Sequence, residues 1–144
     1  MLTAKDIMTK DVAYTKKDAP IYKAVKLLID NEITGIPVVQ DDMTLVGILT
    51  EKDVLRLYRA PAYGRGKTVD DFMTQPAVHF DQNESLDDIC NCLIDYTFRS
   101  VLVTSKGKLV GIISRPDIIK CIMELAGESA VTSGRGAMAG GRKT

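Results

Sequence analysis

The sequence lacks several features that mark common functional classes. Its 19 basic and 19 acidic side chains cancel to a net charge of zero, which argues against a broad nucleic-acid surface, because such a surface needs a basic face. No apolar run approaches the ~20 residues that span a bilayer. The first residues, M-L-T-A-K-D, contain no secretory signal. We therefore expect a cytoplasmic protein that binds neither nucleic acid nor membrane.

Histidine and cysteine are also scarce. The only histidine is His79, and the cysteines are Cys90, Cys92 and Cys121. An odd number of cysteines in a cytosolic chain does not suggest a disulfide framework. Cys90 and Cys92 lie two apart on an expected helix and face different sides, so they are poor joint metal ligands. We expect no metal site, and we interpret Cys90 as core packing and His79 as an ordinary strand residue.

What the sequence does contain is a repeat. V-G-I-L-T-E-K-D-V-L, from Val46 to Leu55, returns as V-G-I-I-S-R-P-D-I-I from Val110 to Ile119. D-I-M-T at Asp6 returns as D-F-M-T at Asp71. The offset changes by one residue inside a short polar turn, which hairpin loops tolerate. The chain is therefore one supersecondary unit written twice, and function is expected on what the two copies share.

Each copy predicts the same order of strand, helix, strand, strand, helix. The long helices show the amphipathic i, i+3, i+4, i+7, i+8 stripe. We expect this stripe to be buried in both copies: Ile21, Ala24, Val25, Leu28 and Ile29, then Leu86, Ile89, Cys90, Leu93 and Ile94. Pro20 suits the start of the first helix and Asp18 can cap it.

The remaining elements follow from local patterns. Short extended pieces are expected at 11–14 and 77–80. Two apolar runs around a polar turn predict a β-hairpin in each copy, at 35–49 and 100–113. Closing helices are expected from Glu51 to about Tyr58 and from Arg115 to about Leu125.

The chain length sets how the copies are organised. A lone half of a 144-residue chain would bury too little apolar surface to be stable on its own. We therefore expect an α+β fold in which residues 3–58 and 68–125 pack sheet to sheet, joined by a Pro- and Gly-containing linker at 59–67. Residues 126–144 are expected to form a flexible C-terminal tail, either a solvated terminus or a contact segment.

These patterns resemble the CBS domain, a family named for the regulatory region of cystathionine beta-synthase. The resemblance rests on the D-h-M-T openings, the helix, the h-P-V-V strand and the V-G-h-h-[ST]-x-x-D motif in each copy, and it covers residues 3–125. It implies two pseudo-twofold-related motifs, a Bateman module, with two clefts between them. Such pairs commonly bind adenosine-containing ligands, act as regulators and form homodimers.

The T/S-x-x-D motifs are the first candidate ligand residues. Gly47 permits a close backbone approach, and Thr50 stands where a strand becomes a helix, whose free N–H groups favour phosphate. Asp53 can accept two ribose hydroxyls. Ser114 and Asp117 repeat the pair. The same pattern is also typical of a capping box, and one hydroxyl could serve both purposes.

The resemblance implies the other residues of each cleft. Thr50 and Asp53 would meet Thr74, His79, Phe98 and Arg99 of the other copy, whereas Ser114 and Asp117 would meet Thr9, Tyr14, Ile33 and Thr34. Ile33 and Phe98 would form the walls around the base. Only the second copy has a basic residue, Arg99, before its strand, so the cleft that contains Arg99 is expected to prefer phosphate. Lys10, Lys52 and Arg115 are alternative sources of positive charge.

The favoured function is a non-catalytic regulatory or sensor module that binds AMP, ADP, ATP or S-adenosylmethionine and signals to an unknown regulated protein. No cofactor is expected beyond this regulatory ligand. The alternative is a structural interaction module with non-functional clefts. An enzyme is not expected, because the chain contains neither the P-loop G-x-x-x-x-G-K nor G-x-G-x-x-G.

Overall fold

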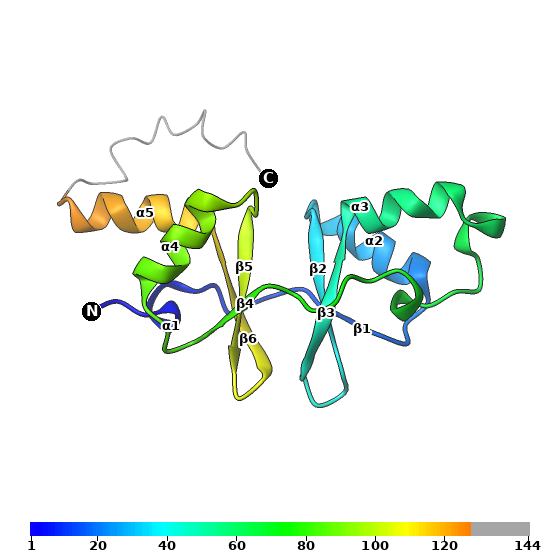
Figure 1. Ribbon diagram of the computed structural model, residues 1–144, viewed down its shortest axis with the longest axis horizontal. Helices are drawn as coiled ribbons and strands as arrows, with labels where there is room; N and C mark the ends of the chain where they lie inside the picture. Colours follow the sequence, from blue (N-terminus) through cyan, green and yellow to red (C-terminus); the bar gives the residue numbers. More distant parts are fainter. Residues whose placement is uncertain (128–144) are drawn as a thin grey trace.

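The computed structural model describes residues 1–127, so most of the expected tail lies outside the described residues. These residues form two halves, each with a three-stranded sheet and its own helices (Figure 1). The first half contains β1 (Thr15–Lys16), α2 (Ile21–Asn31), β2 (Gly35–Val39), β3 (Leu45–Thr50), α3 (Glu51–Leu55) and a 3₁₀ turn (Arg56–Arg59). The second contains β4 (His79–Asp81), α4 (Leu86–Asp95), β5 (Ser100–Ser105), β6 (Lys108–Ser114) and α5 (Arg115–Leu125).

The two sheets have the same topology. β1 pairs parallel with β2, and β2 pairs antiparallel with β3; β4, β5 and β6 repeat this order. Both expected hairpins are present, and the α+β fold of two repeated units is confirmed. The short first strands start later than expected, at Thr15 and His79.

Two helix predictions need correction at their ends. The α-helix expected to reach Tyr58 stops at Leu55 and continues as a 3₁₀ turn. The N-cap of α2 is Pro20 and makes no side-chain capping bond, so Asp18 does not cap this helix. The loop expected at 59–67 contains a further 3₁₀ turn, Pro61–Gly64, in which Gly64 has a φ of 77° and packs closely on Leu57 and Phe72.

The helical stripes are only partly buried. Ile21, Ala24 and Leu28 are buried on α2, and Ile89 and Leu93 on α4. Ile29 and Ile94, expected in the same stripes, are instead 69% and 71% exposed. Each is eight residues beyond the start of its stripe, which on a helix of 3.6 residues per turn places it about 80° away from the first member. These positions lie at the border of the buried face.

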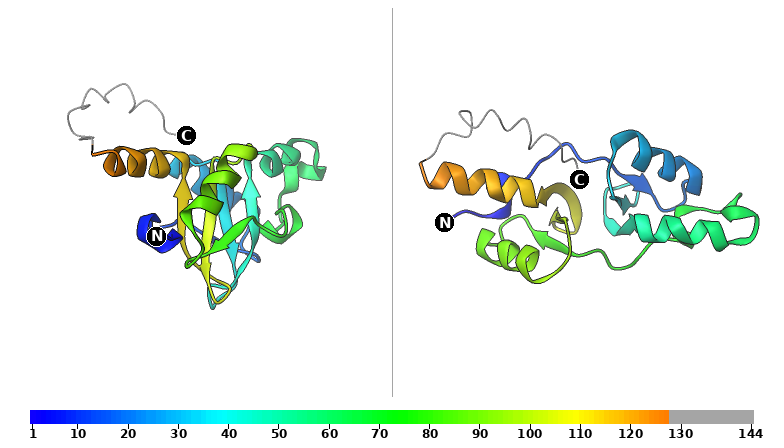
Figure 2. Two further views of the ribbon diagram at one scale, coloured as in Figure 1. Left: turned by 60° about the vertical axis from the view of Figure 1, so that its left-hand side comes forward. Right: turned by 90° about the horizontal axis from the view of Figure 1, so that it is seen from above.

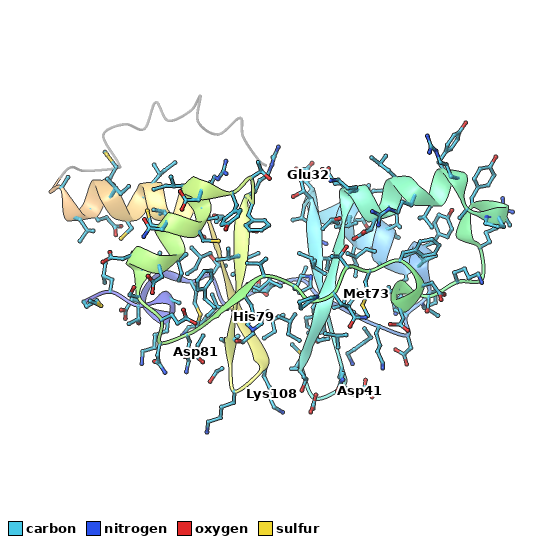
Figure 3. The ribbon with its side chains drawn as sticks, viewed as in Figure 1. Glu32, Asp41, Met73, His79, Asp81 and Lys108 are labelled. Atoms are coloured by element: carbon cyan, nitrogen blue, oxygen red, sulfur yellow. The ribbon has the colours of Figure 1, made fainter. Side chains whose placement is uncertain are left out.

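The sheets pack against each other across the centre of the molecule. Their shared core is built from buried and half-buried side chains of both halves: Val39, Leu45 and Ile48 from the first, with Leu102, Leu109 and Ile112 from the second. The hairpin tips are also joined, because Leu45 N donates to Gly107 O at 3.0 Å and Leu109 N donates to Met43 O at 3.0 Å. Figure 3 shows Asp41 and Lys108 near these tips.

The segments that open the two copies are exchanged between the halves. The short helix α1 (Ala4–Ile7) contacts α5 and β6, and the fully buried Ala4 belongs to the second core. The 3₁₀ turn Val69–Asp71 places Val69 in the first core. Figures 1 and 2 show the N-terminal segment lying on the half that carries α4 and α5 before the chain crosses to the other half. The segment that opens each copy therefore packs into the core of the other half.

Among residues 1–127, no helix combines the length and the apolar character needed to cross a membrane.

Candidate functional site

The exchange brings Thr74 against β3 of the first half. Ile48 N donates to Thr74 O at 3.0 Å, and Thr74 N donates back to Ile48 O at 2.8 Å. A Cβ atom on Gly47 would lie 2.5 Å from the Thr74 carbonyl oxygen, closer than real Cβ contacts permit. Gly47 is therefore required by the crossing backbone of the other half.

The second half repeats this crossing with Thr9. Thr9 N donates to Ile112 O and Ile112 N donates to Thr9 O, both at 2.9 Å. A Cβ atom on Gly111 would meet the Met8 side chain at 2.6 Å and the Thr9 carbonyl oxygen at 3.0 Å. The two glycines of the repeated V-G-h-h motif thus have the same structural purpose.

Thr50 and Asp53 form a capping box at the start of α3. The Asp53 carboxylate accepts from Thr50 N at 2.9 Å and from Thr50 Oγ1 at 3.0 Å, and Asp53 N donates to the same hydroxyl at 3.3 Å. The capping interpretation of this motif is therefore correct, and it is compatible with a second use of the same carboxylate.

The Asp53 carboxylate has two further partners. Thr74 Oγ1 donates to both of its oxygens, at 3.0 and 3.1 Å. Arg56 donates from a guanidinium nitrogen to Oδ1 at 2.9 Å. Only 2% of the Asp53 side chain is exposed, against 62% of the Arg56 side chain. We call Thr50, Asp53, Arg56 and Thr74 the first site.

Ser114 and Asp117 form the equivalent capping box at the start of α5. Asp117 Oδ2 accepts from Ser114 N at 2.8 Å and from Ser114 Oγ at 2.9 Å. Asp117 is half-buried, and its carboxylate has no other hydrogen-bond partner among the residues that the structure describes. We call Thr9, Ser114 and Asp117 the second site.

The T-x-x-D pattern is not specific to these two places. Thr3 with Asp6 and Thr68 with Asp71 are also capping boxes, at the starts of the exchanged segments. Hydrogen bonds from Thr3 lower the pKa of Asp6, although this carboxylate lies on the surface. These two boxes were not predicted from the sequence, although the offset of 65 residues between them marks them as part of the repeat. The four boxes share one geometry, so burial and neighbours must distinguish a ligand site from a plain cap.

Arg99 and Thr34 were expected to contact the T/S-x-x-D motif of the other half. Their main-chain carbonyls instead accept hydrogen bonds from their own half. Arg115 N donates to Arg99 O at 3.1 Å, and Glu51 N donates to Thr34 O at 3.0 Å. Arg99 therefore lies beside the start of α5, next to Ser114. Within residues 1–127, its side chain makes no hydrogen bond or ion pair with Thr50 or Asp53.

The expected walls also pack on their own halves. Ile33 contacts the first core, and Phe98 contacts the second core and the Tyr96 ring, with ring centres 5.6 Å apart. Of the residues expected to meet Asp53, Thr74 alone does so by a hydrogen bond in the described part of the chain. The other cross-half contacts stay predictions.

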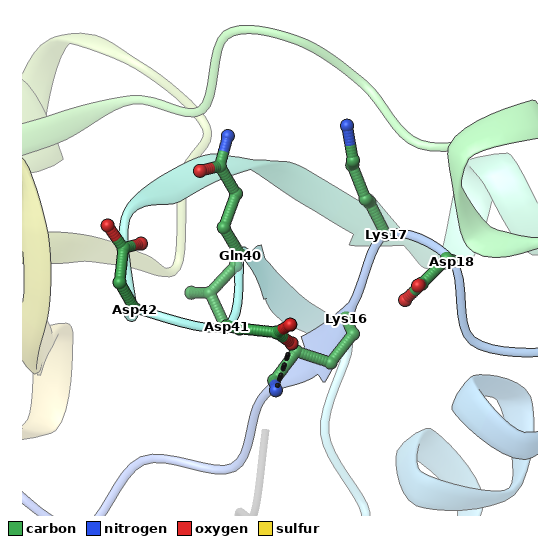
Figure 4. Close-up of a pocket in the computed structure, with 7 residues that line it drawn as sticks. Lys16, Lys17, Asp18, Gln40, Asp41 and Asp42 are labelled. Carbon is green, nitrogen blue, oxygen red and sulfur yellow. Dashed lines mark hydrogen bonds and ion pairs between the residues drawn. The ribbon is translucent and has the colours of Figure 1, made fainter.

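Tyr14 and His79 lie at the two short first strands. Tyr14 directly precedes β1 and is 43% exposed. His79 lies on β4 (Figure 3), and its Nδ1 is 2.9 Å from Ala77 O. An open hollow elsewhere on the first half is lined by residues 16–18 and 39–42, where Lys16 Nζ lies 2.9 Å from Asp41 Oδ1 (Figure 4). None of the predicted ligand-binding residues lines this hollow.

Two arginines near the closing helices make contacts that were not predicted from the sequence. Arg56 is three residues after Asp53, at the end of α3, and this helical spacing brings opposite charges together, so the pair was open to prediction. Arg115 donates to Leu93 O at 3.2 Å and to Tyr96 O at 3.0 Å. Arg115 therefore ties α5 to the end of α4, and its guanidinium group is not directed at Ser114 or Asp117 by any of these bonds.

The cysteines belong to the packing of the second half. Cys90 and Cys92 both contact the second core, and burial raises the pKa of the Cys92 thiol, with a smaller contribution from Asp95. Cys121 is buried. Within residues 1–127, the His, Cys, Asp and Glu side chains form no group of three that could hold a metal ion.

The repeated sheets, the exchanged openings and the paired capping boxes define a tandem pair of one domain. The CBS domain model matches residues 4–60 and 69–124. The chain belongs to the CBS domain family and carries two copies of the domain, as the sequence resemblance predicts.

Individual relatives are similar in sequence or in structure. The protein MJ1225 of Methanocaldococcus jannaschii is 30% identical over 82% of this chain, which spans 42% of the length of that relative. The crystal structure of CBSX2 in complex with AMP has a TM-score of 0.77 at 28% identity, covering 88% of this chain and 99% of CBSX2. CBSX2 is from Arabidopsis thaliana. The CBS pair of MJ0100, in complex with 5′-methylthioadenosine and S-adenosyl-L-methionine, has a TM-score of 0.69 at 26% identity, covering 85% and 96% of the two chains.

Proposed function

We propose that this protein is a non-catalytic regulatory module that binds an adenosine-containing ligand beside its two T/S-x-x-D motifs. The observation that carries the proposal is the placement of Asp53 and Asp117 at strand-to-helix junctions crossed by the other half. Support also comes from CBSX2 and MJ0100, two relatives crystallised with AMP and with S-adenosyl-L-methionine.

The chemistry of the motif suits a nucleoside. A carboxylate offers acceptor positions for two adjacent ribose hydroxyls. The start of α5 adds the positive end of an 11-residue helix, which favours a phosphate. The main chain of Arg99 lies beside this helix start, so we assign any phosphate contact of Arg99 to the second site, a change from the sequence-based expectation. Ile33, Thr34 and Phe98 remain the proposed surroundings of the base.

A binding function is favoured over catalysis by what the chain offers. Its only histidine contacts the Ala77 carbonyl, and the phosphate-binding sequence motifs of common nucleotide-hydrolysing enzymes are missing. In this proposal the ligand signal passes to an unknown regulated protein. A cytoplasmic location stays a prediction from the sequence.

We further propose a homodimer formed through the helices. Large apolar side chains are exposed on the helices of both halves: Ile29, Leu55, Tyr58, Ile94, Ile119, Ile122 and Leu125. Such repeated exposure of apolar groups is typical of an interaction surface. A second copy of the chain would present the same helices and would cover them symmetrically.

The dimer is tested by sedimentation of the wild type and two variants. Ile122→Glu places a charge on the proposed interface and should give a monomer. Val78→Glu, at a residue that is 42% exposed outside the helices, should remain dimeric. A monomeric wild type, or a dimer that survives Ile122→Glu together with Leu55→Glu, would contradict the helical interface.

The ligand proposal is tested by thermal unfolding of the full chain with AMP, ADP, ATP or S-adenosylmethionine, and with GMP as the matched control. A ligand at 100 times its dissociation constant stabilises the folded state by ~2.7 kcal/mol, which raises the Tm by roughly 10 °C for a domain of this size. At least one adenosine compound should give such a shift, and GMP should not. If no adenosine compound changes the Tm, the structural module with non-functional clefts is the better description.

A further inference from the structure

The two aspartates of the repeated motif differ in how many of their acceptor positions are already filled. Asp53 accepts from four donor groups: Thr50 N, the Thr50 hydroxyl, the Thr74 hydroxyl and the Arg56 guanidinium. An ionised carboxylate has about four acceptor positions. Because its side chain is also 2% exposed, the Asp53 carboxylate offers a ribose neither a vacant position nor access.

Asp117 is in a different state. Both of its bonds, from Ser114 N and Ser114 Oγ, go to Oδ2. Within residues 1–127, no donor reaches Oδ1, and the residue is half-buried. This carboxylate can accept hydroxyl groups without losing an existing bond.

The difference comes from two positions of the repeat. Arg56 corresponds to Lys120 in the second copy, and Lys120 makes no ion pair with Asp117 in the described chain. Thr74 corresponds to Thr9, which keeps the main-chain pairing with the opposite strand but does not donate its hydroxyl to Asp117. Both copies thus keep the capping box. Within residues 1–127, only the first copy adds hydrogen bonds from Arg56 and Thr74 to the motif aspartate.

We infer that the second site is the ligand-ready site of this protein, and that Arg56 and Thr74 close the first site by occupying the carboxylate positions a ribose would need. The inference rests on the proposed function, and it makes Arg56 a residue that sets the relative affinity of the two sites. Arg56 is mostly exposed, so its side chain can move into solvent when ligand competes for Asp53. The first site therefore fills after the second, at higher ligand concentration.

The size of the difference follows from the bonds that must break. Displacing a hydrogen bond to a charged group weakens binding by about ten- to a hundredfold. The exposure of Arg56 reduces its share, because ion pairs open to solvent contribute little. We expect the first site to bind at least about tenfold more weakly than the second.

Calorimetry of the full-length chain with AMP tests this order. The wild type should show one tight and one weaker site. Asp117→Asn should remove the tight site. Arg56→Ala should strengthen the weaker site by up to about tenfold, whereas the matched variant Lys120→Ala should leave both sites unchanged. Thr74→Val, which keeps the side-chain shape and removes the hydroxyl, should act in the same direction as Arg56→Ala and serves if that variant does not fold.

The outcomes separate the inference from the function beneath it. Two equal sites in the wild type, or a tight site that survives Asp117→Asn, would overturn the closed first site and leave nucleotide binding intact. An unchanged weak site in both Arg56→Ala and Thr74→Val would also overturn it. No binding of AMP by the wild type, Arg56→Ala or Thr74→Val would overturn both the inference and AMP as the ligand of the proposed function.

Discussion

The two halves of this chain have the same order of elements but use their motif aspartates differently. In the first half, Asp53 ties together its own helix, Arg56 and the crossing Thr74 segment. In the second half, Asp117 belongs to the cap of an 11-residue helix, and its Oδ1 accepts no hydrogen bond from the described residues. One carboxylate is a structural junction, and the other has an oxygen that accepts no hydrogen bond from the described residues. A repeated motif therefore does not imply two equal sites.

The helices that follow the two motifs differ in length. α3 has five residues before it tightens into a 3₁₀ turn, whereas α5 continues for 11. A longer regular helix aligns more peptide dipoles at its start. The second half thus combines the open carboxylate with the stronger helix start and with the neighbouring main chain of Arg99.

The largest expected effect is on stability at the two aspartates. Asp53→Ala removes the cap and the tie to Thr74 and leaves buried donors unpaired, so it should lower the free energy of unfolding by about 2–3 kcal/mol. Asp117→Ala removes a cap alone and should cost about 1 kcal/mol. Urea unfolding of both variants at neutral pH measures the difference. Equal losses would mean that the Thr74 and Arg56 contacts add nothing to the first half.

A smaller difference is expected at the two motif glycines. In Gly47→Ala the new Cβ would strike a backbone oxygen, that of Thr74, whereas in Gly111→Ala the closest atom belongs to the flexible Met8 side chain. Overpacking costs roughly 1–3 kcal/mol, and we expect Gly47→Ala to be the more destabilising of the two. Thermal unfolding of the pair provides the measurement. The reverse order would show that the crossing segment on β3 moves more easily than the one on β6.

The smallest effect is expected at the two surface capping boxes. Thr3→Ala and Thr68→Ala each remove a cap from a short exposed turn and should each cost about 0.5–1 kcal/mol. Neither should alter AMP binding, because neither box belongs to the first or second site. Unfolding curves and AMP titrations of both variants check this. A gain of AMP affinity at the first site in Thr68→Ala would show that the Val69–Asp71 turn helps to position Thr74.

The fold could be predicted from the sequence because each structural element has a counterpart in the other copy. Each hydrophobic period appears in both copies, so the hairpins and helices could be placed from sequence. The exposed Ile29 and Ile94 were placed wrongly because the stripe was extended by one residue past the buried face. Periodicity gives the direction of a face but not its width.

The site was predictable in its motif residues and less so in their surroundings. Thr74 was expected at Asp53 from the family resemblance, and its hydrogen bonds are present. The closing contact of Arg56 follows from helix spacing but was missed, because Asp53 had already been assigned to ribose. The position of Arg99 beside Ser114 depends on the pairing of Ser100 with Ser114 within one sheet, which a strand prediction alone does not specify.

The central claim is that an adenosine nucleotide enters the second site before the first. Amide NMR spectra of the full chain during titration with AMP test it at individual residues. The account predicts that the amide signals of Ser114 and Asp117 shift at low AMP concentration and that those of Thr50 and Asp53 respond only later. Simultaneous shifts at both motifs, earlier shifts at Thr50 and Asp53, or no shifts at either motif would contradict it.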